Sequence, residues 1–317
     1  MTIILSNLQR LTSVVPSSLD AARYMQLLFK AETIADSASL LKTDEEISVE
    51  HVGLGDAEVE FVSPKTASGI WRERLSKHGA ALLSLTFNVP DLEAATKLLE
   101  EENVHPIEQQ PSRCVFDTME IVGFNIELSQ GQARPAPLSL WGRASPLLHV
   151  EITHHDEQAA SKWLKRVFGA QSVETEFSDF LVKTTGGRMK HIHHVQLGDT
   201  VLQYIDPTSE AGPWYDQLQE RGSSVHNLTW LVDNMEEIAA ASERAGTRDL
   251  RYFEFDYSKL FGEDTRLKPK VIGRIIDPAA LLGFHTELSE PQASNINAFL
   301  LKQVPQHMLK VVEGTDI

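Results

Sequence analysis

Cysteine is almost absent from this chain of 317 residues, in which Cys114 is the single example. One cysteine excludes an intramolecular disulfide and any CxxC zinc motif. The same scarcity fits a reducing compartment, so we expect a cytoplasmic protein. No apolar run approaches the roughly 20 residues of a membrane-spanning helix, and the first residues lack the apolar core of a signal peptide. We therefore expect neither membrane association nor a leader segment.

Basic residues are also scarce. Lys and Arg number 29 against 45 Asp and Glu, which gives a formal net charge of −16. Binding to nucleic acid requires a concentrated basic face, and no run of Lys and Arg supplies one, so we expect no nucleic-acid partner. Hydrophobic residues make up an ordinary 42%, and the length predicts two globular domains.

An internal duplication runs through the chain. Four segments of the first half recur in the same order in the second half, which chance does not readily produce. The pairs are QRLTSVVPSSLDAARYMQLLFKA (9–31) with LHVEITHHDEQAASKWLKRVFGA (148–170), HVGLGDAEVEFVSP (51–64) with HVQLGDTVLQYIDP (194–207), GAALLSLTFNVPDLEAATKLL (from 79) with GSSVHNLTWLVDNMEEIAAAS (from 222), and GFNIELSQ (123–130) with GFHTELSE (283–290).

The duplication divides the chain into two domains, at residues 1–132 and 146–290. Between them lies a linker at 133–145, within a stretch rich in Pro, Gly, Ala and Ser. A tail at 291–317 follows and contains a short amphipathic stretch. This stretch covers either the first domain or the partner in a homodimer, and the sequence leaves both alternatives open.

Each half divides again into two similar units. In the third unit a short apolar strand, LLHVEIT, precedes the amphipathic helix EQAASKWLKRVF, whose apolar residues recur at helical spacing. Three extended segments follow: FLVKTT (180–185), HIHHVQLGD and TVLQYIDP, the last two joined by a Gly-Asp turn. The fourth unit repeats this plan. The sequence therefore predicts an α+β fold made of four βαβββ modules.

This order, with strand endings such as LQYIDP and GFHTELSE, resembles the vicinal oxygen chelate superfamily, which includes glyoxalase I, methylmalonyl-CoA epimerase, extradiol dioxygenases and bleomycin-resistance proteins. The resemblance covers nearly all of the chain up to residue 290. It implies two tandem half-barrel domains, each built from a pair of modules. It also implies one divalent metal ion, held by the first and last strands of two modules.

The resemblance places four metal ligands in the second half: His149, Gln203, His226 and Glu287. Imidazole, amide and carboxylate groups suit Zn, Co, Mn, Ni or Fe(II). The aligned positions of the first half are Arg10, Glu60, Leu83 and Glu127. Since Arg and Leu do not ligate a divalent metal, we expect the first half to have lost its site. Arg10 is expected to pair with Glu60 and Glu127 instead.

Three histidines close together in one strand need separate interpretation. Alternation places His191 and His193 on one face and His194 on the other. His194 aligns with His51 of the half without a site, so we interpret His194 as structural. His193 is the candidate for proton transfer, because histidine titrates near neutrality, and Glu287 is a second candidate base. His285 is expected to point away from Glu287.

Three functions fit the pattern. The favoured one is a metal-dependent isomerase, epimerase or lyase, which polarises a carbonyl or carboxylate and moves a proton on the adjacent carbon. The His-Gln-His-Glu set resembles that of methylmalonyl-CoA epimerase. The alternative is an extradiol dioxygenase with a His-His-Glu iron site, although a Gln ligand would occupy a position that oxygen chemistry needs open. A third is a protein that only sequesters its ligand. In each case the partner is a small molecule that chelates through oxygen.

Overall fold

The computed structural model describes residues 2–5, 7–34, 46–131, 144–173, 189–207, 212–232, 234–256 and 270–291. Almost all of the predicted linker and tail lies outside these residues. So does the segment 180–185, for which a strand was predicted.

The first half forms one eight-stranded mixed sheet with the strand order β2-β3-β4-β1-β5-β8-β7-β6. Its elements are β1 (Leu8–Val14), α1 (Ser18–Phe29), β2 (Glu32–Thr33), β3 (Ile47–Leu54), β4 (Ala57–Pro64), α2 (Ile70–His78), β5 (Ala81–Asn88), α3 (Leu92–Glu101), β6 (Pro106–Gln110), β7 (Arg113–Phe116), α4 (Met119–Val122) and β8 (Asn125–Ser129).

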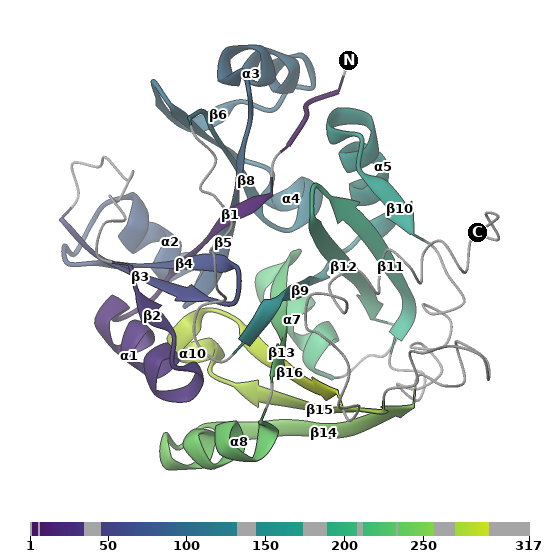
Figure 1. Cartoon of the computed structure of the whole chain (residues 1–317). Helices are drawn as coiled ribbons and strands as arrows, with labels where there is room; N and C mark the ends of the chain where they lie inside the picture. Colours follow the sequence, from purple (N-terminus) through teal and green to yellow (C-terminus); the bar gives the residue numbers. More distant parts are fainter. Residues whose placement is uncertain are drawn as a thin grey trace.

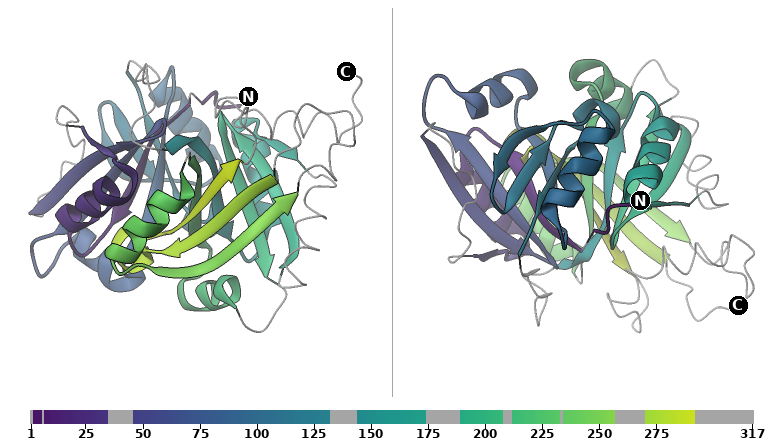
Figure 2. Two further views of the ribbon diagram at one scale, coloured as in Figure 1. Left: turned by 60° about the horizontal axis from the view of Figure 1, so that its bottom comes forward. Right: turned by 90° about the horizontal axis from the view of Figure 1, so that it is seen from above.

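The second half repeats this architecture in the order β10-β11-β12-β9-β13-β16-β15-β14. Its elements are β9 (Ala144–Thr153), α5 (Glu157–Phe168), β10 (Gln171–Val173), β11 (Met189–Leu197), β12 (Thr200–Pro207), α7 (Pro213–Arg221), β13 (Ser224–Val232), α8 (Met235–Arg244), β14 (Arg248–Asp256), β15 (Lys270–Asp277), α10 (Ala279–Leu282) and β16 (His285–Pro291). The two sheets lie side by side in both views of Figure 2. The predicted α+β fold, with four βαβββ modules in two tandem domains, is confirmed.

Local sequence signals explain where the module helices begin and end. In α5, the Asp156 side chain accepts a hydrogen bond from the Ala159 backbone N–H, which caps the helix. Gly169 ends the helix in the left-handed conformation, at φ 65°. Between these ends, Trp163, Leu164 and other apolar side chains form the buried face that the sequence pattern predicted.

One hydrophobic core joins the two halves, because a single cluster of buried side chains contains residues of both sheets. Phe29 of α1 and Trp230 of β13 meet in it, with ring centroids 6.3 Å apart. Tyr204 of β12 donates a hydrogen bond to the Val122 carbonyl across the boundary, at 3.0 Å. Figure 1 shows β9 and β13 at the centre of the second sheet. Among the described helices, none combines the length and apolarity needed to cross a membrane.

Candidate metal centre

Three side chains of the second sheet come together as a candidate metal site. They are His149 and Glu151 of β9 and Glu287 of β16, whose ligand atoms all lie within 4.8 Å of one another. His149 and Glu151 are two residues apart in a strand and therefore share a face. Strand pairing brings Glu287 to the same face, because Thr229 of β13 is in register with both His149 and Glu287.

Polar groups of β13 fix two of these side chains. The Thr229 hydroxyl lies 2.9 Å from Nε2 of His149, and the Asn227 amide donates to Glu287 Oε2 at 3.3 Å. Burial lowers the pKa of His149 to about 4. The imidazole is therefore neutral at physiological pH, which is the form that binds a metal.

His226 is turned toward this group by a strand irregularity between Val225 and Asn227. Gln217 donates through its Nε2 to the Val225 carbonyl, so its Oε1 faces Nδ1 of His226 at 2.6 Å. An oxygen there requires the proton on Nδ1, which leaves the lone pair on Nε2. This Nε2 lies 4.0 Å from Glu151 Oε1. Ligand atoms around one six-coordinate ion, with bonds near 2.1 Å, are about 3.0–4.2 Å apart, so both atoms fit the same cation.

Gln203, the fourth predicted ligand, lies on the same face. It is in register with Glu151 on the neighbouring strand. Its amide Nε2 is 2.9 Å from Nε2 of His194. Burial lowers the pKa of His194 to about 3, so that ring is neutral and accepts the hydrogen bond. The structure thus adds Glu151, which was not predicted, to the group with His149 and Glu287.

His193 and His194, neighbours in β11, each lie on the face of the sheet that was predicted for the other. His193 Nε2 is 2.8 Å from the hydroxyls of both Ser161 and Ser172, on the face that packs against α5. His193 was predicted to transfer a proton, but its ring lies on the face of the sheet opposite to the candidate ligands. His194, interpreted as structural, lies on the ligand-bearing face beside Gln203.

His285 was expected to point away from Glu287, but the two side chains lie on the same face of the sheet. It precedes Glu287 by two residues in β16, so both side chains point the same way. Its ring centroid lies 4.7 Å from that of His226, and its Nδ1 lies 3.0 Å from Asp277 Oδ1. Burial lowers the pKa of His285, partly offset by Asp277. Both histidines line a cavity of about 630 Å³, together with Trp214 and Arg221 of α7 and other residues.

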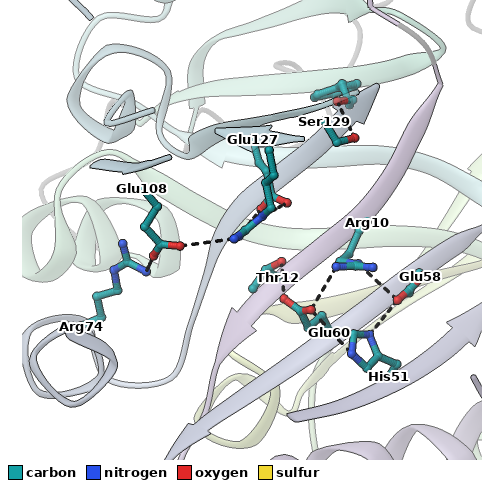
Figure 3. A network of polar contacts seen from close by, with 11 residues as sticks. Arg10, Thr12, His51, Glu58, Glu60, Arg74, Glu108, Glu127 and Ser129 are labelled. Atoms are coloured by element: carbon teal, nitrogen blue, oxygen red, sulfur yellow. Dashed lines mark hydrogen bonds and ion pairs between the residues drawn. The ribbon is translucent and has the colours of Figure 1, made fainter. Parts of the chain in front are cut away.

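Buried ion pairs occupy the equivalent region of the first sheet. The guanidinium of Arg10 lies 3.1 Å from Glu60 and 3.2 Å from Glu58 (Figure 3). The predicted pairing of Arg10 with Glu60 is confirmed. Glu127 differs from the prediction, since it pairs bidentately with Arg113. These contacts place a guanidinium beside each of three buried carboxylates, Glu58, Glu60 and Glu127.

The apolar member of the first-half set is buried in a separate cluster. Leu83, which aligns with His226, is 3% exposed and packs with Val14, Val62 and Trp71. A leucine side chain offers no donor atom, so the position that supplies an imidazole in the second half supplies only packing in the first. The expected loss of the site from the first half agrees with this geometry.

The two halves differ in the charged groups at equivalent positions, and this difference bears on whether a metal fits the second half. The positions of Arg10 and Arg113 are taken there by His149 and Gly273, as the strand registers show. The second half therefore keeps a carboxylate at Glu287 and gains one at Glu151, but lacks the two guanidinium groups at those positions. A divalent cation bound by imidazole and carboxylate would supply the positive charge. The donor set fits such an ion.

No family model matches the sequence, and no curated protein matches it either. Solved structures match over nearly the whole chain. A triple mutant of 4-hydroxymandelate synthase from Streptomyces coelicolor aligns with a TM-score of 0.64 at 13% identity, over 98% of this chain and 99% of that one.

Two further structures support the same fold. A fusion protein of a xylose isomerase-like TIM barrel and 4-hydroxyphenylpyruvate dioxygenase gives a TM-score of 0.58 at 14% identity, over 94% of this chain and 51% of that one. BphC, a halotolerant catechol dioxygenase, gives 0.54 at 10% identity, over 93% and 90%. The chain therefore shares the fold of these structures, which agrees with the fold that the resemblance to the vicinal oxygen chelate superfamily implied.

Proposed function

We propose that the protein is an enzyme that uses one divalent metal ion and acts on a small molecule that chelates through two oxygens. The observation that carries this proposal is the meeting of His149, Glu151 and Glu287 on one face of the second sheet, with His226 4.0 Å from Glu151. Among the described residues this is the group of His, Cys, Asp and Glu side chains able to hold a metal.

The residues of the site have separate tasks in this proposal. His149 and His226 supply neutral imidazoles, since burial lowers the pKa of both rings. Asn227 restrains Glu287 through the hydrogen bond at 3.3 Å. A bound divalent ion would polarise the oxygens of the substrate. The cavity that His226 lines provides room for a molecule of moderate size beside this imidazole.

For the reaction we favour an oxygenase with iron as the metal. Two of the structures similar to this chain are described as dioxygenases, one as part of a fusion, and the similarity to 4-hydroxymandelate synthase covers both domains. The two imidazoles and a carboxylate match the 2-His-1-carboxylate set of non-haem iron oxygenases. Gln203 counts against this choice if its amide oxygen ligates, because the contact with His194 engages only its amide nitrogen.

An isomerase, epimerase or lyase is the second candidate, and Glu151 favours it. Two carboxylates beside two imidazoles give four protein donors, which leaves about two positions of a six-coordinate ion for a chelating substrate. Glu151 or Glu287 could then act as the general base. Since similar folds host different reactions, measurement must separate the two candidates.

The test is to purify the protein without chelators and determine metal identity and stoichiometry by elemental analysis, with His149→Ala and Glu287→Gln as site variants. The exposed neighbour His155→Ala serves as the control. One equivalent of iron, lost in both site variants, with oxygen uptake on catechol or 4-hydroxyphenylpyruvate, would support the oxygenase. One equivalent of another divalent metal, with deuterium exchange beside a carbonyl and no oxygen uptake, would support the isomerase or lyase. Absence of metal after reconstitution would refute both.

A further inference from the structure

The helix that follows the first module of each half carries a tryptophan at the same place. Trp71 is the second residue of α2, and Trp214 is the second residue of α7; both helices have nine residues. Both side chains are buried, with 3% and 6% exposed. Their surroundings differ, because Trp71 packs in the apolar cluster with Leu83, whereas Trp214 reaches a carboxylate.

The indole Nε1 of Trp214 donates a hydrogen bond to Glu151 Oε1 at 2.8 Å. Glu151 is only 4% exposed, and a buried carboxylate requires hydrogen bonds or charge to offset its lost hydration. The aligned residue in the first half is Thr12, whose hydroxyl donates to Glu60 at 3.2 Å. The tryptophan therefore meets a carboxylate in the half that carries the candidate metal centre.

The same helix also contacts His226, the second imidazole that was predicted as a metal ligand. Gln217, one turn after Trp214, accepts from Nδ1 of His226 at 2.6 Å. Its amide nitrogen is anchored on the Val225 carbonyl at 3.0 Å. The Trp214 and His226 rings lie 6.1 Å apart. One rigid helix thus orients a carboxylate and an imidazole whose ligand atoms are 4.0 Å apart.

We propose that α7 is the positioning element of the metal centre. Trp214 directs the Glu151 carboxylate toward His149 and Glu287, and Gln217 fixes the tautomer of His226 so that Nε2 faces Glu151. The inference rests on the proposed function, because it requires a metal at this site. Groups that orient metal ligands in this way commonly change metal affinity by about 10–100-fold when removed.

Two matched pairs of variants test the proposal, with Co(II) as the probe in a competition titration against a chelator. Trp214→Phe keeps the ring and loses the donor, and Trp71→Phe makes the same change in the first half. We expect Trp214→Phe to bind Co(II) about 10–100-fold more weakly, with Trp71→Phe unchanged. Gln217→Leu should weaken binding similarly, whereas Gln217→Glu, which keeps an acceptor for Nδ1, should retain it.

Spectroscopy separates positioning from a general structural effect. The visible absorption of bound Co(II) should change in Trp214→Phe and Gln217→Leu and stay unchanged in Trp71→Phe. Equal affinity and spectra in the wild type, Trp214→Phe and Gln217→Leu would overturn the inference while leaving the proposed function standing. If Trp214→Phe does not fold, the contrast between Gln217→Leu and Gln217→Glu decides. A wild-type protein that binds no Co(II) would refute the proposed function itself.

Discussion

Arg113 donates two hydrogen bonds to Glu127, from Nε to Oε1 at 2.6 Å and from the terminal nitrogen to Oε2 at 3.0 Å. The two side chains are 3% and 1% exposed. Glu127 occupies the position that Glu287 occupies in the second half. In the first half, the guanidinium of Arg113 therefore offsets the free energy of burying the Glu127 carboxylate. The equivalent position of the second half belongs to the candidate metal centre. Under the proposed function, both halves would place a cation beside the buried carboxylates of the same face of the sheet.

Removal of this guanidinium should destabilise the protein strongly. In Arg113→Met the Glu127 carboxylate stays buried without its bidentate partner, and the expected loss is about 3–5 kcal/mol in the free energy of unfolding. Urea denaturation measures it. Arg166→Met is the control, since its contact with Glu102 is exposed and such pairs contribute about 1 kcal/mol or less. Similar losses in the two variants would contradict the role assigned to Arg113.

Gly283 is expected to be irreplaceable at the boundary between the halves. Its φ is +88°, and an added Cβ would lie 2.6 Å from backbone atoms of Ala81 in β5. Gly222 has a φ of +73° with open space around it. Gly222→Ala should therefore cost only the backbone strain, about 1 kcal/mol. Gly283→Ala should add overpacking and cost roughly 3 kcal/mol or more. Equal unfolding midpoints for these two variants would contradict this prediction, because the backbone near Ala81 would then shift at no cost in stability.

The repeat made much of this fold predictable, because four aligned segments fix the module order without any knowledge of packing. His149 and Glu287 were predicted from the family resemblance, which places ligands on the first strand of the third module and the last strand of the fourth. Glu151 was missed because the family resemblance places no ligand at its position. Its signal was its spacing of two from His149, which places both on one face of β9.

Other details of the site could not be read from the sequence. Alternation separates His193 from His194 but does not say which of them faces α5, and this depends on the packing of Ser161 and Ser172. The strand irregularity at His226 also breaks simple alternation, so that both His226 and Asn227 approach the ligand-bearing side. Tertiary hydrogen bonds, which no local pattern encodes, decide both cases.

The free energy of unfolding should fall as the pH is lowered below about 6.5. The direction of the pKa shift of His154 gives the reason. Burial lowers the pKa of this ring below its ordinary value of 6.5, and its Nδ1 accepts a hydrogen bond from the Asp156 backbone N–H at 2.9 Å. Between the folded and unfolded pKa values the unfolded chain binds more protons, so stability is present above the unfolded pKa and is lost as the pH falls.

The contribution of one such ring is at most about 1.4 kcal/mol per pH unit. Urea unfolding at pH 7.5, 6.5 and 5.5 should show a shallower decline for His154→Asn than for the wild type. His155→Asn, at the exposed neighbouring position, should keep the wild-type slope. An unchanged slope in His154→Asn would show that this imidazole contributes nothing to the acid sensitivity.

His193 provides the sharpest test of which face of the second sheet carries the metal. Its ring lies between two serine hydroxyls on the side of α5 and is 2% exposed. His193→Asn should therefore lose about 1–3 kcal/mol of stability through its buried hydrogen bonds and still bind one equivalent of metal. His149→Asn, on the opposite face, should lose the metal, and elemental analysis of both folded variants gives the comparison. If a folded His193→Asn protein lost its metal while His149→Asn kept it, the ligands would have to lie on the α5 side, and the centre built from His149, Glu151 and Glu287 would be incorrect.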